Sequence, residues 1–312
     1  MPDDKRYDIM VIGGGPAGLA AGLYAARARR RTVLLEKGVL GGQIGLTDCV
    51  ENYPGIESIN GFDLAQAMLK HAESCGLETN YVEVTGLQQQ EDQRWRVHTN
   101  DGYYLAKAVI VTSGANPNKL GVPGEERLTG RGVSYCATCD APFFRDQEVA
   151  VVGGGDSALD EGIFTTRYAA KVYVVHRRDQ LRASRILQER AFANPKMEFI
   201  WSTVVAEILS DEEVSGVKLR NLLSKEERVL PVQGVLIFIG QHPNTDYLQG
   251  LVSMDEGGHI LVNEWMETER PGLYAAGDVR QNSARQVVTA AGDGATAAIA
   301  ADHYISNNFP AE

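Results

Sequence analysis

The sequence predicts an α/β protein with two domains, each built on a parallel β-sheet. Three observations support this prediction. The chain has 312 residues, which is too long for one typical domain and suits two. A unit of strand, glycine-rich turn, helix and strand occurs twice. The 33 glycines exceed the usual share of about 7%, which favours tight turns and close backbone approaches.

The first copy of this unit begins with an apolar strand at residues 7–12. A G-x-G-x-x-G turn comes next, then a helix to about Arg29 and a strand at 32–35 that ends in an acid. In this context the turn admits a pyrophosphate at the helix N-terminus, and the acid accepts hydrogen bonds from ribose hydroxyls. The pattern predicts a Rossmann-like dinucleotide site. Its residues are Gly13, Gly15, Pro16, Ala17, Gly18 and Glu36.

The second copy has a strand at 148–152, a glycine turn, a helix to about Ala169 and a strand at 171–175. In both copies 23 positions separate the first glycine from the residue after the second strand. Here that residue begins a basic run, with a further arginine one helical turn on. The expected site residues are Gly153, Gly155, Asp156, Ser157, Ala158, His176, Arg177, Arg178 and Arg182.

The acid and the basic run predict different nucleotides. A carboxylate repels a 2′-phosphate, whereas guanidinium groups bind one bidentately. The first site therefore favours a nucleotide with free ribose hydroxyls, FAD or NAD, and the second favours NADPH. The alternative for the arginines is a solvated basic helix start. That alternative leaves unexplained why the basic run stands where the first copy has its acid.

Two later segments fit the first domain rather than the second. Residues 108–115 read as a buried strand ending in a glycine turn, and residues 272–278 read as another strand ending in an acid. The second copy lies between them, so we expect the first domain to be discontinuous. The expected domains are residues 1–115 and 245–312, which bind FAD, and residues 116–244, which bind NADPH.

Composition excludes several classes of partner. The net charge of −11 argues against nucleic acid or an anionic membrane as the main partner. No apolar run approaches the roughly 18–20 residues of a membrane span. The N-terminal residues lead directly into the first strand, so we expect no signal peptide and a cytoplasmic protein.

Two of the four cysteines, Cys136 and Cys139, form a C-x-x-C. That spacing is typical of either half a zinc site or a redox pair. A structural zinc needs four ligands, and no second C-x-x-C or nearby histidine pair exists, so redox chemistry is favoured and no metal is expected. The pair lies 14 residues before Gly153, within the inserted domain. Asp140 comes directly after it as a candidate acid/base, with a helix cap as the alternative.

Together these features resemble the low-molecular-weight thioredoxin reductases, class II of the pyridine nucleotide-disulfide oxidoreductases. The resemblance covers essentially the whole chain. It includes the C-A-T-C-D run, the H-R-R-x-x-x-R arginines, and the segments 41–43, 51–55, 275–278 and 285–290. The chain departs from the family at Ala141-Pro142, where glycine is usual. Because proline restricts the preceding residue, we expect Ala141 to be extended.

The resemblance implies a homodimer in which NADPH reduces FAD and the flavin reduces a Cys136–Cys139 disulfide. Cys139 would face the flavin, Cys136 would attack thioredoxin, and Asp140 would supply a proton. The inserted domain would alternate by rotation between the two electron transfers. Further flavin contacts carried over from the family are Gly42, Gln43, Asn52, Val84, Gly114, Ala115, Gly277, Asp278, Arg285, Gln286 and Val287.

Two other functions are weighed against this one. A flavin thioredoxin reductase fed by ferredoxin would keep FAD and the cysteines but tend to lose the second nucleotide signature, which is intact here. A flavin-bound redox sensor without turnover would leave that signature unexplained. Thioredoxin is the family's usual acceptor, and glutaredoxin-like or peroxiredoxin-linked proteins remain alternatives.

Overall fold

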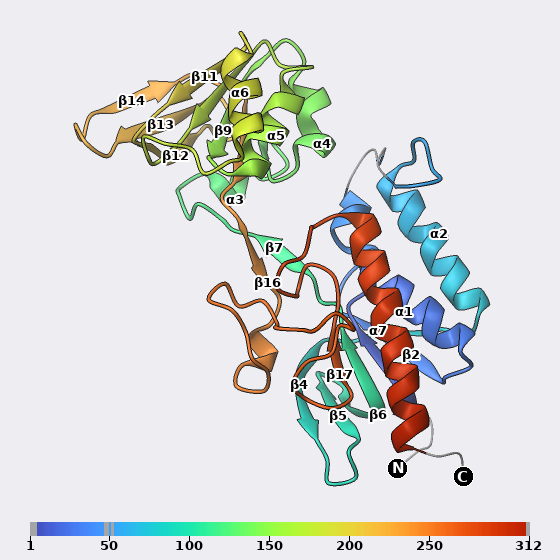
Figure 1. The fold of residues 1–312 in the computed structure, drawn as a ribbon. Helices are drawn as coiled ribbons and strands as arrows, with labels where there is room; N and C mark the ends of the chain where they lie inside the picture. The colour runs from blue at the N-terminus through green and yellow to red at the C-terminus, as the bar shows by residue number, and fades with distance from the viewer. Residues whose placement is uncertain (1–4, 47–49, 51–52, 310–312) are drawn as a thin grey trace. The chain divides into compact units, whose positions relative to one another are not determined.

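The computed structural model describes residues 5–46, 50 and 53–309, without the side chains of residues 46, 138 and 139. It divides into two compact units (Figure 1). Unit 1 comprises Met1–Asn116 and His242–Glu312, and unit 2 comprises Pro117–Gln241. The expected domain ends, 115 and 244, lie one and three residues from this division. The cofactor assigned to each unit stays a prediction.

Unit 1 contains a sheet in the order β3-β2-β1-β6-β5-β4, with β17 also pairing with β6. Its parallel strands are β1 (Arg6–Ile12), β2 (Thr32–Glu36), β3 (Glu78–Tyr81), β6 (Gly102–Val111) and β17 (Leu273–Ala275). Strands β4 (Val84–Gln89) and β5 (Trp95–Thr99) continue it antiparallel. The long β6 serves both parts, because residues 102–106 pair with β5 and residues 109–111 pair with β17.

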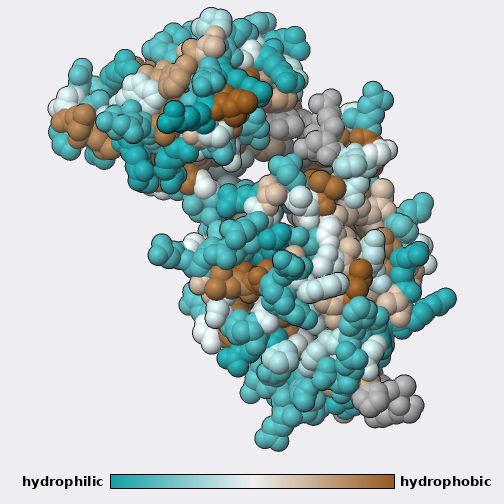
Figure 2. Space-filling view, viewed as in Figure 1, coloured by the Kyte–Doolittle hydropathy of each residue, from teal (hydrophilic) through white to brown (hydrophobic). Residues whose placement is uncertain are grey.

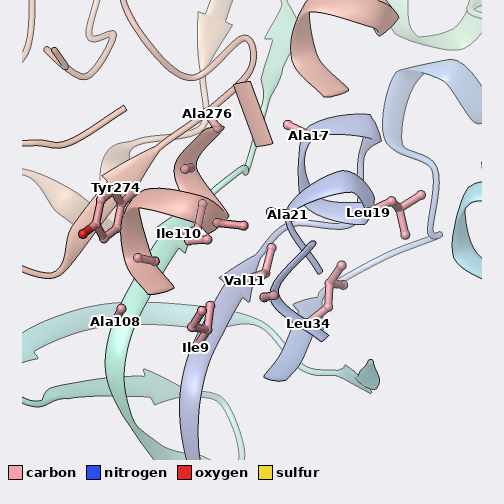
Figure 3. Close-up of a cluster of buried hydrophobic side chains, with 14 of the residues drawn as sticks. Ile9, Val11, Ala17, Leu19, Ala21, Leu34, Ala108, Ile110, Tyr274 and Ala276 are labelled. Atoms are coloured by element: carbon pink, nitrogen blue, oxygen red, sulfur yellow. The ribbon is translucent and has the colours of Figure 1, made fainter. Parts of the chain in front are cut away.

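Three main helices accompany this sheet: α1 (Pro16–Arg27), α2 (Gly61–Ser74) and α7 (Val287–Asn308). Proline begins α1, where a missing N–H costs nothing, and the Asn60 side chain caps α2. Figure 3 shows Ile9 and Val11 of β1 and Ile110 of β6 packed with Ala17 and Ala21 of α1. Residues 9–12 of β1, 32–35 of β2 and 108–111 of β6 are buried, as expected for parallel strands covered on both faces.

Unit 2 has a five-stranded parallel sheet in the order β11-β10-β9-β15-β8. Its strands are β8 (Val133–Ser134), β9 (Glu148–Gly153), β10 (Lys171–Val175), β11 (Met197–Ile200) and β15 (Gly234–Phe238). A separate antiparallel sheet contains β12 (Thr203–Leu209), β13 (Gly216–Asn221) and β14 (Glu227–Leu230). The helical segments are α3 (Glu125–Leu128), α4 (Ala137–Asp140), η3 (Ala141–Phe144), α5 (Asp156–Thr165) and α6 (Arg185–Ala193).

The chain passes between the units in two short strands, β7 (Ala115–Pro117) and β16 (Gln241–Pro243), which pair with each other. Each end of this ribbon has one further hydrogen bond between the two crossing segments. Asn118 N–H donates to the Gly240 carbonyl at 3.0 Å, and Asn244 N–H donates to the Gly114 carbonyl at 2.9 Å. The predicted fold class, two Rossmann-like units with one inserted into the other, is confirmed.

Two local predictions were wrong. The helix after the second glycine turn ends early, at Thr165 instead of about Ala169, because the backbone turns at residues 166–169 replace the next helical turn. The helix after the first turn ends at Arg27, two residues before its expected end. Arg182 lies in the loop before α6, where its N–H donates to the Gly154 carbonyl at 2.7 Å. Ala141 begins η3 instead of being extended, with Pro142 in the first turn of that helix.

We expect Gly294→Ala to lower the free energy of unfolding of unit 1. A Cβ at this position of α7 would collide with the backbone carbonyl of Ala17 in α1. The helices would have to separate, which costs about 1–3 kcal/mol. Denaturant unfolding would measure the loss.

The matched control is Gly292→Ala, two residues earlier in α7. No atom lies within 4 Å of its Cβ position, so stability should be unchanged or rise by up to about 1 kcal/mol through helix propensity. Equal losses in both variants would contradict the close packing of α1 against α7.

Candidate functional site

The glycine turn after β1 is tightly packed at its first and last glycines and open at the middle one. Gly13 has φ +106°, and a Cβ there would lie 2.5 Å from the Thr112 carbonyl oxygen. A Cβ on Gly18 would collide with the Gly13 carbonyl oxygen. At Gly15, by contrast, no atom of the described residues lies within 4 Å of the Cβ position. The turn is therefore packed tightly against β6 and α1 and leaves free space at the N-terminus of α1.

That N-terminus has no side-chain cap. Gly15 is the N-cap residue, and Pro16 and the buried Ala17 come after it. The uncapped backbone N–H groups and the helix dipole favour an anion. Gly42, at the start of η2 (Gly42–Leu46), has its Cβ position 3.4 Å from the Gly15 Cα. Gly42 and the exposed Gln43 thus border the same space.

Glu36 is held by backbone groups. Its Oε2 accepts from the Gly14 N–H and its Oε1 from the Gly38 N–H, both at 2.7 Å. Each carboxylate oxygen keeps acceptor capacity for a further donor, such as a ribose hydroxyl. The Glu36 carbonyl accepts from the Val82 N–H at 2.9 Å, and the half-buried Val84 begins β4 two residues later.

A second acid lies beyond β17. Asp278 accepts from the Ser283 hydroxyl at 2.9 Å, and Ser283 Oγ also accepts from the Arg285 N–H at 3.2 Å. Burial raises the pKa of Asp278 above its ordinary value, although the Ser283 hydrogen bond and the Arg285 charge oppose this. A hydrogen-bond donor on a ligand would therefore stabilise the Asp278 carboxylate. Gln286 is the N-cap residue of α7, and Val287 begins the helix.

The loop around Asp278 is fixed by a partly buried ion pair. Arg280 donates to both carboxylate oxygens of Asp293, at 2.7 and 3.0 Å, and the same carboxylate accepts from the Gly277 N–H at 3.1 Å. Gly277 has φ +80°, and a Cβ there would lie 2.9 Å from the Ala17 Cβ. This arrangement holds Gly277 against the first helix, beside the glycine turn.

Gly114 and Ala115 leave the sheet at the same edge. Gly114 has φ +64°, and Ala115 is buried. The carboxyl ends of parallel strands meet at one edge of a sheet, so these residues come after β6 where Gly13 comes after β1 and Gly277 after β17. The structure thus brings most of the expected flavin contacts to one edge. Asn52 lies outside the described residues.

Unit 2 repeats this geometry. Gly153 has φ +151°, and a Cβ there would lie 2.7 Å from the Cβ of the buried Ala158. Gly155 is the N-cap of α5, again without a side-chain cap, and in the part of the chain that the structure describes no atom lies within 4 Å of its Cβ position. The neighbouring Asp156 accepts from the Ser184 N–H at 2.5 Å, and Ser157 is exposed. A second helix N-terminus is therefore open to an anion.

His176 lies under this turn rather than in solvent. It is 5% exposed, and a Cβ on Gly154 would collide with its ring. Its Nε2 is 3.1 Å from the Gln180 carbonyl. Burial lowers the pKa of His176, and the charges of Arg178 and Arg182 lower it further. The ring therefore supports the glycine turn as a neutral group.

Arg177, Arg178 and Arg182 are exposed beside it. Among the described carboxylates, none lies within 4.0 Å of these guanidinium groups. The Arg182 backbone is tied to the turn through Gly154. Three cations without a described counter-charge thus gather on the loop that contacts this turn, an arrangement that suits a phosphate.

The C-x-x-C lies at the start of α4, between β8 and η3. Cys136 is half-buried and disulfide-bonded. Its N–H donates to Ser134 Oγ at 3.0 Å, and its carbonyl accepts from the Asp140 N–H at 3.2 Å. The Asp140 side chain does not cap η3, so the alternative of a helix cap finds no support. The side chain of Cys139 is not among those described.

Within the described part of the chain, no group of three or more histidine, cysteine or acidic side chains is arranged to hold a metal ion. None of the helices in that part is both long and apolar enough to cross a bilayer.

Sequence patterns gave no indication of two residues that shape the sites. Thr112 donates its hydroxyl to the carbonyl groups of Ile12 and Gly13, at 2.9 and 2.8 Å, and so fixes the first turn. Asp293 anchors the loop before Asp278. Only Asp293 has a feature that could have been noticed, as the first of two acids in the glycine- and alanine-rich sequence of α7.

Two dinucleotide-type turns, with a C-x-x-C just before the second, define a nucleotide-dependent disulfide oxidoreductase with two domains. The comparisons agree. The chain belongs to the pyridine nucleotide-disulphide oxidoreductase family, whose sequence model matches residues 7–294.

The relatives are thioredoxin reductases. One from Listeria innocua is 48% identical over 97% of this chain and 95% of its own length. Among solved structures, thioredoxin reductase from Lactococcus lactis has a TM-score of 0.82 at 43% identity, covering 96% of this chain and 99% of that one. The enzyme from Streptococcus pyogenes has a TM-score of 0.78 at 47% identity, covering 98% and 100%. The family resemblance drawn from the sequence is confirmed.

A ferredoxin-flavin thioredoxin reductase from Clostridium acetobutylicum is more distant. It has a TM-score of 0.53 at 30% identity, covering 97% of this chain and 99% of that chain.

The buried His176 gives the stability of unit 2 a pH dependence. In the unfolded chain the imidazole takes up a proton near the ordinary pKa of 6.5, whereas in the folded protein its pKa is lower. The unfolded state therefore binds more protons below pH 6.5, so this contribution to stability is present above that pH and is lost as the pH falls.

We expect His176→Asn to weaken the acid sensitivity of unit 2, measured by hydrogen exchange of the β10 amides at several pH values. His303→Asn, at an exposed position of α7, is the control and should leave that sensitivity intact. An unchanged pH profile in His176→Asn would contradict the assignment.

Proposed function

We propose that the chain is an NADPH-dependent thioredoxin reductase that uses FAD. One observation carries the proposal: arginines with no ion pair to a described carboxylate lie beside an open dinucleotide turn, on the same unit as the C-x-x-C. The arginines indicate NADPH as the electron donor, and the cysteines indicate disulfide reduction as the reaction. An enzyme of the family that matches this chain combines the two.

FAD fits the carboxyl edge of the unit 1 sheet. Its pyrophosphate would meet the uncapped N-terminus of α1 at Gly15, where no Cβ obstructs the approach. Glu36 would accept from the ribose hydroxyls, and Asp278 from a hydroxyl of the ribitol. When bound, the flavin supplies two-electron chemistry between a nicotinamide and a disulfide. The chain's own part is to orient the cofactor with fixed backbone groups.

NADPH fits the turn of unit 2 in the same way. Its pyrophosphate would meet the N-terminus of α5 at Gly155. The 2′-phosphate would pair with Arg177, Arg178 and Arg182, which no described carboxylate neutralises. His176 would act indirectly, because its buried ring supports the turn.

The cysteines would carry the disulfide exchange. After the Cys136–Cys139 disulfide is reduced to a dithiol, the Cys136 thiolate attacks one sulfur of the substrate disulfide, and the other sulfur leaves as a thiolate that takes up a proton. Cys139 then attacks the mixed disulfide, which restores the internal disulfide and releases a reduced dithiol. Asp140, directly after the pair, is the proposed proton donor when the internal dithiol forms.

Thioredoxin is the proposed acceptor, since the relatives carry that name. The surface beside residues 136–140, which we call the redox turn, suits a protein substrate. Phe143 of η3, four residues after Cys139, is 72% exposed. An aromatic side chain left in solvent next to a reactive pair favours docking of a macromolecule.

A homodimer through unit 1 belongs to the same proposal. Its helices expose Tyr24, Phe62 and Ile299, and unit 1 shows separate brown areas in Figure 2. Apolar side chains of this size on helices favour contact with a second copy. A cytoplasmic location is also proposed, because a C-x-x-C that cycles between dithiol and disulfide suits a reducing compartment.

Ferredoxin as electron donor is the second candidate, since a ferredoxin-flavin enzyme is among the structural relatives. An enzyme that takes electrons from ferredoxin would not need the second glycine turn. The open N-terminus of α5 and the three arginines favour NADPH.

The deciding experiment is an anaerobic titration of the FAD-loaded protein. We expect NADPH to bleach the flavin absorbance within the turnover time, and thioredoxin to restore the colour. Bleaching by reduced ferredoxin but not by NADPH would support the second candidate. If NADPH bleaches the flavin but thioredoxin is not reduced, the proposed acceptor is wrong.

Replacing Arg178 by alanine should raise the KM for NADPH but not for NADH. A hydrogen bond to a charged group is worth about 1.5–3 kcal/mol, so the KM for NADPH should rise by roughly 10- to 100-fold. Steady-state kinetics with both nucleotides would measure it. Arg190→Ala, an exposed arginine on α6, is the control and should alter neither value. Parallel losses for NADPH and NADH would exclude a 2′-phosphate contact.

A further inference from the structure

A buried carboxylate lies close to the redox turn and plays no part in the proposed chemistry. Glu125, at the start of α3, is 2% exposed. Its Oε1 accepts from the Leu120 N–H at 2.8 Å, and its Oε2 accepts from the Gly121 and Val122 N–H groups at 2.6 and 3.4 Å. One carboxylate therefore fixes three successive backbone groups of the segment 120–122.

A fourth donor reaches the same carboxylate from the redox turn. The Tyr135 hydroxyl donates to Glu125 Oε1 at 2.8 Å, and Tyr135 immediately precedes Cys136. Burial and the Glu125 carboxylate raise the pKa of Tyr135 to about 12, so the phenol stays protonated as a donor. The next link is also fixed, because Cys136 N–H donates to Ser134 Oγ.

The other side of Glu125 leads to the crossing between the units. Segment 120–122 begins three residues after β7, and Asn118 N–H donates to the carbonyl of Gly240, next to β16. Gly124, with φ +88°, has no room for a Cβ beside the Ile208 carbonyl of β12, so α3 is seated on the body of unit 2. Glu125 thus lies where the entering chain, the body of the unit and the redox turn meet.

We propose that Glu125 and Tyr135 form a positioning pair that fixes the redox turn relative to the segment by which the chain enters unit 2. Glu125 holds the entering segment, and the phenol of Tyr135 transmits that position to Cys136. Neither side chain exchanges electrons or protons with the substrate. The inference rests on the proposed function only in treating Cys136 as the attacking residue.

The informative variant is Tyr135→Phe, which removes one hydroxyl and leaves the three backbone bonds of Glu125 in place. Under native conditions the amides of Cys136 and Asp140 should exchange with deuterium about fivefold faster, the factor by which one ordinary hydrogen bond shifts a local opening equilibrium. Exchange is measured on the FAD-loaded oxidised protein and requires no turnover.

The kinetic signature should be a kcat effect. We expect the kcat for thioredoxin reduction to fall about fivefold in Tyr135→Phe, since one hydrogen bond no longer holds the attacking turn. The KM for NADPH and the rate of flavin bleaching by NADPH should not change, because neither involves the redox turn. Glu125→Gln should show the same split, and the double variant should be no worse than Glu125→Gln, as expected for two residues acting as a pair.

Tyr173→Phe is the matched control. The Tyr173 hydroxyl also donates to a carboxylate of unit 2, Glu148 at 2.9 Å, but at the opposite end of the sheet strands from the glycine turn. Its loss should leave both the Cys136 exchange and the kcat unchanged. Equal effects in the two phenylalanine variants would reduce Tyr135 to a general stabilising contact and overturn the proposal.

The outcomes separate the two proposals. Unchanged exchange at Cys136 and Asp140 in Tyr135→Phe overturns the positioning pair, even if the enzyme reduces thioredoxin. If the wild-type protein passes no electrons from NADPH to thioredoxin, the proposed function fails, while faster exchange in Tyr135→Phe still supports the coupling between Glu125 and the turn.

Discussion

The molecule depends on one arrangement, used twice: an uncapped helix N-terminus held at the carboxyl edge of a parallel sheet. A helix start without a capping side chain leaves N–H groups that need a partner, and water or an anion must provide it. The protein keeps these positions clear by placing glycine where a side chain would fill the space, at Gly15 and Gly155. The surrounding structure then determines which nucleotide fits each position.

The two sites differ mainly in the residue 23 positions after the first glycine of each glycine-turn motif. In unit 1 that position belongs to Glu36, whose oxygens are already oriented by two backbone N–H groups. In unit 2 it belongs to His176, buried under the turn, which leaves the neighbouring arginines free to face solvent. Under the proposed function, this position and the arginines beside it separate a site for ribose hydroxyls from one for a phosphate. The two helix starts themselves are alike, since the N-cap residues Gly15 and Gly155 both have extended backbone.

Much of this was predictable because it is local. The G-x-G-x-x-G spacing, the apolar strands and the order of the segments are written in short stretches of sequence, and they indicated the fold class and the inserted unit. What the sequence did not indicate was decided by backbone groups elsewhere in the fold. The Arg182 N–H donates to the Gly154 carbonyl, and the roles of Thr112, Asp293 and Glu125 depend on partners outside their own short motifs. Side-chain hydrogen bonds of this kind leave no periodic pattern.

The packing of α7 against α1 has a consequence for biosynthesis. Unit 2 is one continuous stretch, Pro117–Gln241, whereas unit 1 needs Met1–Asn116 together with His242–Glu312. On the ribosome the second nucleotide fold is therefore completed first, although its chain emerges later. Until α7 is made, the small-residue face of α1 and the strands beside it have no cover. The apolar surface of residues 1–116 that α7 covers therefore stays exposed until α7 has been synthesised.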